Sequence, residues 1–346
     1  MIAKRLSTFL PGIAAAIALT LAGGQAARAD GEVNVYSYRQ PFLVQPLFDT
    51  FEKETGAKVN VIFASKGLIE RMAEEGESSP ADVLLTVDIG RLEQAVSAGV
   101  AQSVKSDELT ASIPAEFRDG DGRWFALTTR ARVVYASKDR VKQDSITYAE
   151  LADPKWKGRI CIRSGQHEYN LGLIASIIAN EGEEQALKWL EGLKANVARK
   201  PGGNDRGQVK SVHSGECDIA LANTYYMGAM QTNEKEPEQK EWAASVRILF
   251  PDKDTRGTHV NVSGMVMAKH APNRDNALKL MEFLAGDEAQ RIYAELNFEY
   301  PVKPGVAWSD RVKSWGDFKP DTISLSEVAK RIPLASEMVD QVRFNE

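Results

Sequence analysis

The sequence is poor in the residues that build soft-metal and nucleophilic sites. Among 346 residues there are two cysteines and four histidines. The histidines His167, His213, His259 and His270 are scattered, and no pair has the four-residue spacing that places two imidazoles on one helix face. The signatures GxSxG, HExxH, GxGxxG and the P-loop are absent as well. A Cys/His metal centre and the common hydrolase and nucleotide-binding sites are therefore not indicated.

The composition also lacks a large net charge. With 43 Lys and Arg against 48 Asp and Glu the formal charge is −5, whereas proteins that bind nucleic acid non-specifically are usually strongly basic. Hydrophobic residues make up 43% of the chain, so neither a disordered tail nor a disulfide-stapled miniprotein is indicated. At about 150 residues per domain, the length favours two domains.

The chain has no apolar run long enough to span a membrane. The run over residues 9–21 is shorter than the roughly 20 residues that cross a bilayer, and later apolar runs are broken by charge. It follows the cations Lys4 and Arg5 and precedes small residues around Arg28, which is the pattern of a cleavable secretory signal. We predict that residues 1–29 form a signal peptide; a retained anchor is the weaker alternative.

If the chain is exported, its two cysteines lie in an oxidising compartment, where disulfides form. An even number of cysteines in an oxidising compartment favours a disulfide between Cys161 and Cys217. Each lies at the edge of a short β-like run, and the two runs are candidates for neighbouring strands. Two separate buried thiols remain the alternative. A catalytic cysteine is disfavoured because no histidine lies at a suggestive spacing.

Strand-like and helical patterns alternate along the chain after the signal, which is typical of a layered α/β fold. Strands are expected over 32–37, 58–63, 82–86, around 132–135, at 160–162, over 219–222, 245–250 and 260–269. Helices are expected over 43–55, 67–75, 89–98, 171–181, 183–195, 274–284 and 288–296. The stretch 201–205 is predicted as a turn and 234–241 as a solvated loop or helix end. Two α/β lobes with several crossings would place a ligand in the cleft between them.

A tandem of tyrosines, Tyr225 and Tyr226, follows directly after the β run that ends at Ala222. On a regular strand their side chains would face opposite ways. At a strand end that leads into a turn near Gly228, both phenols can reach one cleft. From this pattern alone, ordinary packing of two amphipathic aromatics is the favoured interpretation.

Six stretches in order along the chain change that balance. They are 34–41 (NVYSYRQP), 80–88 (PADVLLTVD), 127–132 (LTTRAR), 161–165 (CIRSG), 222–226 (ANTYY) and 257–264 (GTHVNVSG). Together they resemble the periplasmic ferric-iron-binding proteins of ABC importers, which are transferrin-like solute-binding proteins. The resemblance covers nearly all of the chain after the signal, and the joint order of the stretches is specific.

The resemblance implies that Tyr169, Tyr225 and Tyr226 are iron ligands. Many relatives carry a His or a His-Tyr pair just after the first strand, where this chain has Gln40-Pro41. Neither residue offers an imidazole or a phenolate. The subgroup that shares the stretch 36–41 is expected to use three tyrosines and a small anion such as carbonate or bicarbonate. The resemblance assigns that anion to Arg39, Gln40 and Arg130.

The chemistry of the ion agrees with this ligand set. Fe(III) is a small, hard cation, so anionic oxygen suits it better than thiolate. A phenol with a pKa near 10 is mostly protonated at neutral pH, but a trivalent ion at bonding distance drives it to phenolate. Three phenolates offset three positive charges, and a planar oxyanion held by a guanidinium fork fills two further positions.

The sequence thus predicts an α/β protein with two lobes, each a mixed sheet flanked by helices, joined by crossing hinge strands. The N-terminal lobe is expected to contain residues 30–128 and 259–300, and the C-terminal lobe residues 129–258 and 301–346. The resemblance further implies a monomeric periplasmic protein that is not an enzyme. It would bind Fe(III), deliver it to an inner-membrane permease and ATPase complex, and bind no nucleic acid.

Two other functions remain open on the sequence. The first is binding of a small oxyanion, a polyamine or another organic solute on the same fold. The second is an enzyme that uses Cys161 or Cys217 covalently. Tyr36 and Tyr38, which flank Ser37 in the first strand, are expected to pack in the core or behind the ligands rather than to bind the metal.

Overall fold

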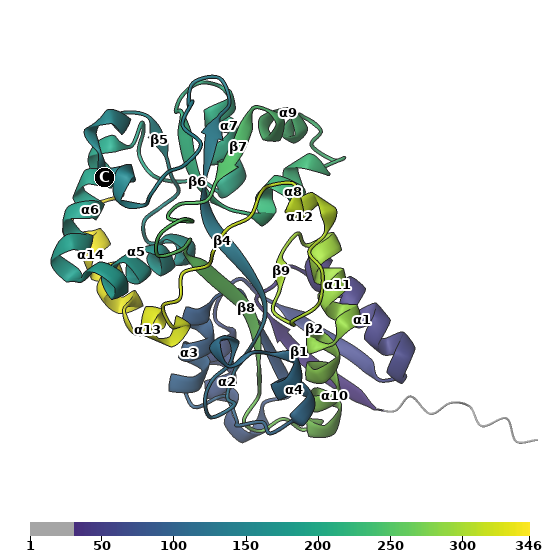
Figure 1. The fold of residues 1–346 in the computed structure, drawn as a ribbon. Coiled ribbons are helices and arrows are strands. Elements are labelled where there is room, and N and C mark those ends of the chain that lie inside the picture. Colours follow the sequence, from purple (N-terminus) through teal and green to yellow (C-terminus); the bar gives the residue numbers. More distant parts are fainter. Residues whose placement is uncertain (1–30) are drawn as a thin grey trace, which may run out of the picture.

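A computed structural model describes residues 31–346, so the signal peptide predicted for residues 1–29 lies outside the described residues. Figure 1 shows two helix-covered lobes, with α1, α2 and α10 in the lower one and α6, α7 and α9 in the upper one. Two long strands, β4 and β8, run between them. The mixed α/β architecture predicted from the sequence is confirmed.

The strands are β1 (Glu32–Ser37), β2 (Lys58–Phe63), β3 (Val83–Thr86), β4 (Phe125–Ser137), β5 (Ile160–Cys161), β6 (Ile219–Asn223), β7 (Val246–Leu249), β8 (Val260–Met267) and β9 (Tyr300–Pro301). The helices are α1 (Pro41–Thr55), α2 (Leu68–Glu75), α3 (Ile89–Ser97), α4 (Asp107–Ser112), α5 (Glu168–Glu181), α6 (Glu183–Asn196), α7 (Asp205–His213), α8 (Tyr225–Gln231), α9 (Glu238–Ala244), α10 (Arg274–Ala285), α11 (Asp287–Leu296), α12 (Asp310–Lys313), α13 (Leu325–Lys330) and α14 (Ile332–Gln341). Four short 3₁₀ helices lie at Gly76–Ser78, Ala115–Phe117, Ala149–Ala152 and Pro154–Trp156.

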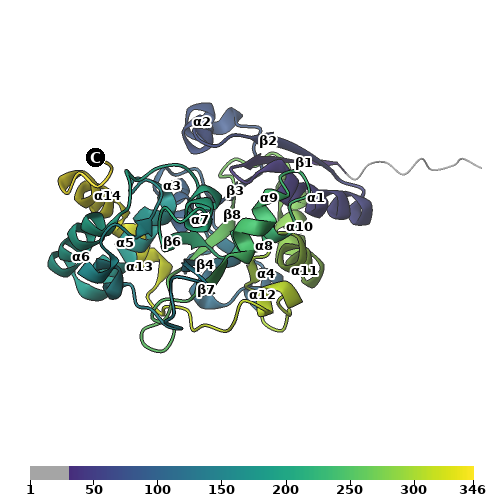
Figure 2. The same cartoon turned by 90° about the horizontal axis from the view of Figure 1, so that it is seen from above.

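The strands of residues 31–346 join in one sheet with the order β2-β1-β3-β8-β4-β6-β5, and β7 and β9 also pair with β4. Strand β1 pairs in parallel with β2 and β3, and β5 pairs in parallel with β6. Strand β8 is antiparallel to both β3 and β4. Seen from above in Figure 2, the central strands lie between α5 and α6 on one side and α8, α10 and α11 on the other.

Strand β4 belongs to both lobes. Its first half, up to Ala131, pairs with β8, and its second half, from Arg132, pairs with β6 and β7. All of its residues are buried. The sequence predicts only the second half, because Thr128, Arg130 and Arg132 interrupt the apolar pattern. These polar side chains are tolerated because each has a hydrogen-bond partner in the interior.

Two core regions support the two ends of β4. One is built from residues between Val33 and Leu127 and between Val262 and Val302, with Leu325 added. The other consists of two hydrophobic clusters formed by residues between 131 and 260. Residues between 328 and 344, in the C-terminal helices, belong to one of these clusters. We call these regions the N-lobe and the C-lobe. The predicted domain boundaries remain a prediction, and Val302 and Leu325 pack with the N-lobe core although the boundary assigns them to the other lobe.

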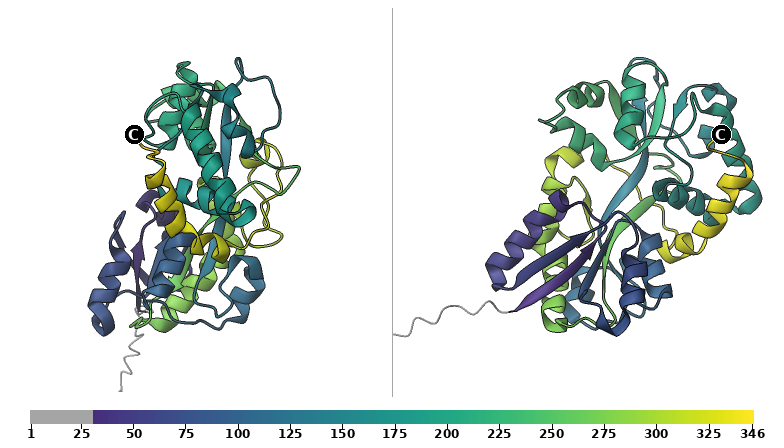
Figure 3. Two further views of the ribbon diagram at one scale, coloured as in Figure 1. Left: turned by 90° about the vertical axis from the view of Figure 1, so that its left-hand side faces the viewer. Right: turned by 180° about the vertical axis from the view of Figure 1, so that it is seen from behind.

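The C-terminal segment makes a further connection between the lobes. Helix α13 contacts α3 of the N-lobe and α5 of the C-lobe. Ser326 on α13 donates a hydrogen bond of 2.8 Å to Glu93 on α3, which also accepts from the Trp124 indole at 3.1 Å. Figure 3 shows this yellow segment beside the junction of the two lobes.

Most predicted elements are present, several with the predicted ends, whereas α4, α12, α13 and α14 have no counterpart among the predicted helices. Three helices near the predicted ligands also differ from the prediction. Helix α5 begins at Glu168 rather than 171, because the Nδ1 atom of His167 accepts the Tyr169 backbone N–H at 3.2 Å and caps the first turn. Helix α8 begins at Tyr225, where the sequence predicts a strand end and a turn. Helix α7 begins at Asp205, inside the predicted turn, with Asn204 as its cap.

The predicted disulfide is present. Cys161 ends β5, Cys217 precedes β6, and their Cα atoms lie 5.9 Å apart. Both sulfur atoms that the rival enzyme hypothesis requires are therefore bonded to each other. Within residues 31–346, no helix has the length and apolar character to cross a membrane.

The disulfide closes a loop with a sequence separation of 56 residues. In the chain-entropy description, a loop of that size stabilises the fold by about 4 kcal/mol. We therefore expect the double variant Cys161→Ala/Cys217→Ala to lose about this much free energy of unfolding in urea titrations. Wild-type protein unfolded with a thiol reductant should match the variant. An unchanged unfolding midpoint under reduction would contradict the stabilising role.

Candidate functional site

The candidate site lies where two neighbouring strands of the C-lobe end. Strands β5 and β6 are parallel, so their carboxyl ends open at the same edge of the sheet. The chain leaves β5 toward α5, whose first turn contains Tyr169, and leaves β6 toward α8, whose first two residues are Tyr225 and Tyr226. The topology therefore gathers the three tyrosines predicted as ligands at one edge of the C-lobe.

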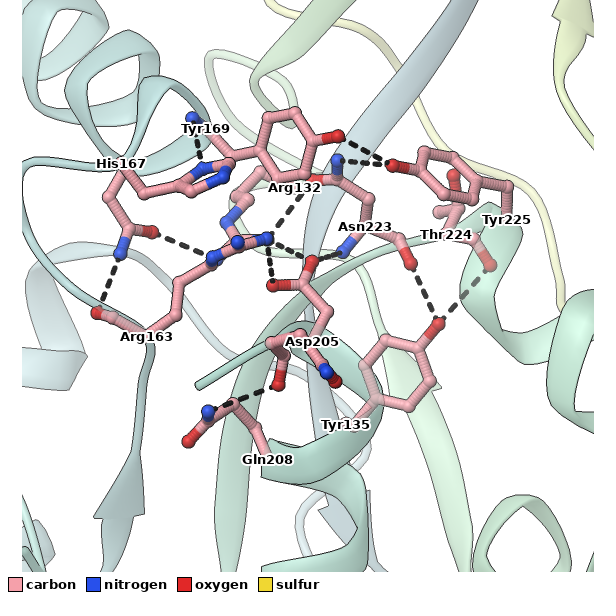
Figure 4. A network of polar contacts seen from close by, with 12 residues as sticks. Arg132, Tyr135, Arg163, His167, Tyr169, Asp205, Gln208, Asn223, Thr224 and Tyr225 are labelled. Carbon is pink, nitrogen blue, oxygen red and sulfur yellow. Dashed lines mark hydrogen bonds and ion pairs between the residues drawn. The ribbon is translucent and has the colours of Figure 1, made fainter. Parts of the chain in front are cut away.

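Tyr225 contacts both of the other tyrosines, and Figure 4 shows its hydroxyl beside that of Tyr169. The Tyr225 hydroxyl donates a hydrogen bond to the Tyr169 hydroxyl with an O–O distance of 3.0 Å. The rings of Tyr225 and Tyr226 lie with centroids 4.4 Å apart. All three tyrosines are half-buried.

This placement opposes ionisation of the phenols. Burial raises the pKa of Tyr225 well above its usual value, and the neighbouring phenols of Tyr169 and Tyr226 raise it further. Burial followed by the Tyr169 phenol also raises the pKa of Tyr226. The raised pKa keeps Tyr225 and Tyr226 neutral at pH 7 unless a cation lies beside them, and a cation bound to their oxygens must replace their protons.

Three guanidinium groups surround the Tyr169 ring. The Cζ atoms of Arg130, Arg132 and Arg163 lie 5.8, 5.8 and 5.1 Å from its centroid. Two of them, Arg132 and Arg163, form ion pairs with the buried Asp205 at 2.6 and 3.2 Å. The surroundings of the phenols are therefore cationic overall, which suits a site that collects anionic oxygen ligands.

Arg130 differs from the other two because no carboxylate pairs with it among the ion pairs of the described residues. Its Nη2 donates to the Val87 carbonyl, while its Nη1 is buried with no hydrogen-bond partner. It lines a small polar cavity together with Arg132, Tyr169, Asn223, His259 and Asn261. A buried N–H without a partner costs free energy, so an acceptor that reached this Nη1 would be favoured.

The other two residues predicted to hold an anion are placed differently. Arg39 forms a buried ion pair with Glu299 at 2.7 Å, and the same carboxylate accepts from Thr128 and Ser263. Burial alone would lower the pKa of Arg39, but Glu299 and nearby phenols keep it above its usual range. Gln40 is exposed and precedes α1 without capping it. The structure thus gives Arg39 a carboxylate partner of its own, and the anion role of both residues stays a prediction.

Tyr36 and Tyr38 have partners away from the three phenols. The Tyr36 hydroxyl donates to the Glu75 carboxylate at 3.0 Å. The Tyr38 hydroxyl accepts the backbone N–H groups of Leu68 and Ile69 at 2.9 and 3.0 Å. Both side chains are buried in the N-lobe core, as the sequence analysis expects.

Sequence reasoning missed the residues that support the site. Asp205 is fully buried at the start of α7, although its stretch is predicted as a turn. The usable signal is Asn204-Asp205 followed by apolar residues at Val209 and Val212, which is a helix start with a cap. Asn170 and Asn223, which neighbour the tyrosines, are buried as well.

Carboxylate, thiolate and imidazole groups do not gather into an alternative centre. In the described part of the chain, no group of three or more His, Cys, Asp or Glu side chains is placed to hold a metal ion. The three phenols of Tyr169, Tyr225 and Tyr226 therefore stay the candidate oxygen donors for a metal ion.

Comparison with known protein families identifies the family to which this chain belongs. The family model for bacterial extracellular solute-binding proteins matches residues 46–320. The chain belongs to this family. Solute-binding proteins of this kind have the two-lobed α/β fold seen here, and the solved structures that the chain matches include ferric-binding proteins.

Several relatives are iron-binding by name. The chain is 47% identical to iron uptake protein A1 of Synechocystis over 312 residues, covering 90% of this chain and 86% of that protein. The structure of apo ferric ion-binding protein A from Pasteurella haemolytica is 53% identical, with a TM-score of 0.87 over 91% of this chain and 98% of that one. A Trichodesmium protein in complex with iron and citrate is 44% identical with a TM-score of 0.86, over 91% and 100% of the chains. The resemblance drawn from the six sequence stretches is confirmed.

One testable consequence concerns His259 beside the cavity. Burial, with Arg256 nearby, lowers the pKa of His259 to about 3, whereas an unfolded histidine titrates near 6.5. Below about pH 6.5 the unfolded chain binds a proton that the folded protein does not, so stability falls as pH falls. At pH 5 this histidine should cost about 2 kcal/mol of unfolding free energy.

The measurement compares urea unfolding at pH 7 and pH 5 in His259→Gln and wild type. The variant should lose about 2 kcal/mol less on acidification than the wild type. The exposed His270 provides the control, because His270→Gln should follow the wild type. Equal pH dependence in both variants would show that His259 is not held neutral by the fold.

Proposed function

We propose that this protein is the periplasmic Fe(III)-binding component of an ABC iron importer. The observation that supports this most is the contact of Tyr169 with Tyr225, beside Tyr226, at one sheet edge within a cationic setting. Phenolate oxygen is a hard anionic donor, and the ion it suits is small and highly charged. Iron uptake and ferric-binding proteins among the relatives point in the same direction.

In this proposal Fe(III) is cargo, bound by Tyr169, Tyr225 and Tyr226. Ionising Tyr225 and Tyr226 against their raised pKa is unfavourable without the metal, and the trivalent charge supplies the compensation. Three phenolates leave coordination positions of the ion open. A small oxyanion on the free Nη1 of Arg130 is placed to fill them, and we propose carbonate.

The lobes would close around the cargo by bending at the elements that join them. These are β4, β8 and the C-terminal segment that carries α13. An ion pair already links the lobes beside a ligand: Arg91 on α3 lies 3.5 Å from Glu168, which precedes Tyr169. We propose that an inner-membrane permease and ATPase complex recognises the loaded monomer.

Binding of an oxyanion without iron is the second candidate function. The free N–H of Arg130 in a polar cavity favours it, since this group would hold a phosphonate or carboxylate equally well. A relative 28% identical over 272 residues carries a name that refers to 2-aminoethylphosphonate. Iron-loaded protein with a visible phenolate-to-metal band supports the first function, and colourless protein that binds only the oxyanion supports the second.

The ligand assignment is tested by Tyr226→Phe, which removes one phenol oxygen and keeps the ring that packs on Tyr225. We expect folding to survive, the visible band to weaken, and Fe(III) affinity measured by chelator competition to fall at least tenfold. Tyr293→Phe is a matched control, because the Tyr293 hydroxyl is buried with no hydrogen-bond partner in the N-lobe. Unchanged affinity in Tyr226→Phe would remove this residue from the site.

The anion is tested by Arg130→Ala. A guanidinium near a metal repels it unless an anion lies between them, so the loss of Fe(III) affinity should be larger when bicarbonate is scarce. Excess bicarbonate, or citrate in a parallel titration, should recover part of the loss. If wild-type protein binds Fe(III) with the same affinity and spectrum in anion-free buffer, the anion proposal fails.

A further inference from the structure

A buried charge network lies directly behind the phenols (Figure 4). Its centre is Asp205, whose carboxylate accepts from Arg132 at 2.6 Å, from the Asn223 backbone N–H at 2.9 Å and from Arg163 at 3.2 Å. Asp205 is fully buried and Arg132 is nearly so. Both oxygen atoms of the carboxylate are therefore used within the protein.

Arg132 connects Asp205 by hydrogen bonds to residues that lie near two proposed ligands in the sequence. Its Nη1 also donates to the Asn223 side chain at 3.1 Å, and its Nη2 donates to the Asn170 side chain at 2.8 Å. Asn170 follows Tyr169 directly, and Asn223 lies two residues before Tyr225. One guanidinium thus ties the first turn of α5 to the end of β6, the two segments that present these phenols.

The connection to α5 is fixed on both sides. The Asn170 amide donates to the carbonyl groups of Arg163 and Ser164, each at 3.0 Å, in the loop that leads into the helix. The Asn223 amide reaches the Tyr225 hydroxyl at 3.4 Å. The network therefore ends on the ligand-bearing segments.

The distance held by this arrangement matches what a metal requires. Two adjacent oxygen ligands of an octahedral ion with bonds of about 2.1 Å lie about 3 Å apart. The phenol oxygens of Tyr169 and Tyr225 are 3.0 Å apart. Their separation thus already suits shared coordination, so little rearrangement of these two side chains would be needed.

A stability role alone explains this network poorly. Burying a charged pair costs several kcal/mol of desolvation per ion, and its attraction often does no more than offset that cost. Residues that orient metal ligands commonly show such otherwise expensive buried hydrogen bonds. The contacts of Arg132 also use the planar, forked geometry of its guanidinium group. The compact ammonium group of a lysine would not make the same set of hydrogen bonds.

We propose that Asp205 and Arg132 are positioning residues that set the separation of the Tyr169 and Tyr225 phenol oxygens for joint binding of one metal ion. The inference rests on the proposed function, since it concerns the ligands of that site. It adds two residues that reach the cargo only through the tyrosines.

The experiment compares Asp205→Asn and Arg132→Lys with wild type. Asp205→Asn keeps the side-chain volume but cannot hold two guanidiniums, and Arg132→Lys keeps the positive charge but loses the fork. Loss of a residue that orients a ligand weakens metal binding by about 10–100-fold. We expect a loss of this size in Fe(III) affinity from both variants, with a shifted or weakened visible band.

The chain offers a matched control at the opposite end of β6. Asp218 also pairs with two arginines, Arg140 and Arg159, at 2.5 Å each, but lies just before β6 rather than beside the tyrosines. Asp218→Asn should lower the free energy of unfolding while leaving Fe(III) affinity and the visible band unchanged. This separates a general loss of an arginine-paired carboxylate from loss of the ligand geometry.

The outcomes distinguish the inference from the function on which it rests. Wild-type protein without a visible iron band would end the proposed function. Wild type that binds iron, with Arg132→Lys showing the same affinity and spectrum, would overturn the positioning role and leave the function standing. If Asp205→Asn does not fold, Asn170→Ala keeps the Arg132–Asp205 pair and removes the side chain that ties Arg132 to α5 and to the loop before it. A loss of Fe(III) affinity would then support the positioning role, and unchanged affinity and spectrum would overturn it.

Discussion

The pairing of one strand, β4, with strands of both lobes is the constraint on which the rest of the structure depends. Alternate residues of a strand point to one face, so Thr128, Arg130 and Arg132 follow one another along a single side of β4. Each meets a different buried partner: Glu299, the Val87 carbonyl and Asp205. The strand therefore both joins the lobes and delivers guanidinium groups to the site from a rigid, fully buried backbone.

The charges along β4 explain why the site forms where it does. Thr128 and Arg132 each contact a buried carboxylate, whereas Arg130 has no carboxylate partner among the described residues and has a buried Nη1 without a hydrogen-bond partner. Buried polar groups are tolerated when they are satisfied, and an unsatisfied one marks a place that gains from a ligand. The Arg130 guanidinium lies 5.8 Å from the Tyr169 ring, so an anion bound to it, as we propose, would lie close to the phenols.

The sequence predicts regular elements and the identity of the tyrosines better than it predicts how they are arranged. Strands β1 and β2 have the predicted ends because their alternating apolar residues pack on one core. The start of α8 at Tyr225 is missed because no cap or charge pattern precedes it, and packing decides the conformation. Local patterns do not reveal that Arg39 pairs with Glu299, which lies 260 residues away in the chain; the anion role of Arg39 stays a prediction.

The phenol cluster satisfies its hydrogen bonds in two charge states with one geometry. With protons in place, Tyr225 donates to Tyr169 across 3.0 Å, so neither neutral hydroxyl is isolated. The same separation suits two phenolates on one ion, and a bound cation would then replace both hydroxyl protons. Because the oxygens need not move apart, the cost of binding lies mainly in removing protons rather than in rearranging side chains. If these side chains bind a cation as proposed, a highly charged ion is favoured, since a weakly charged ion would not offset the raised pKa of Tyr225 and Tyr226.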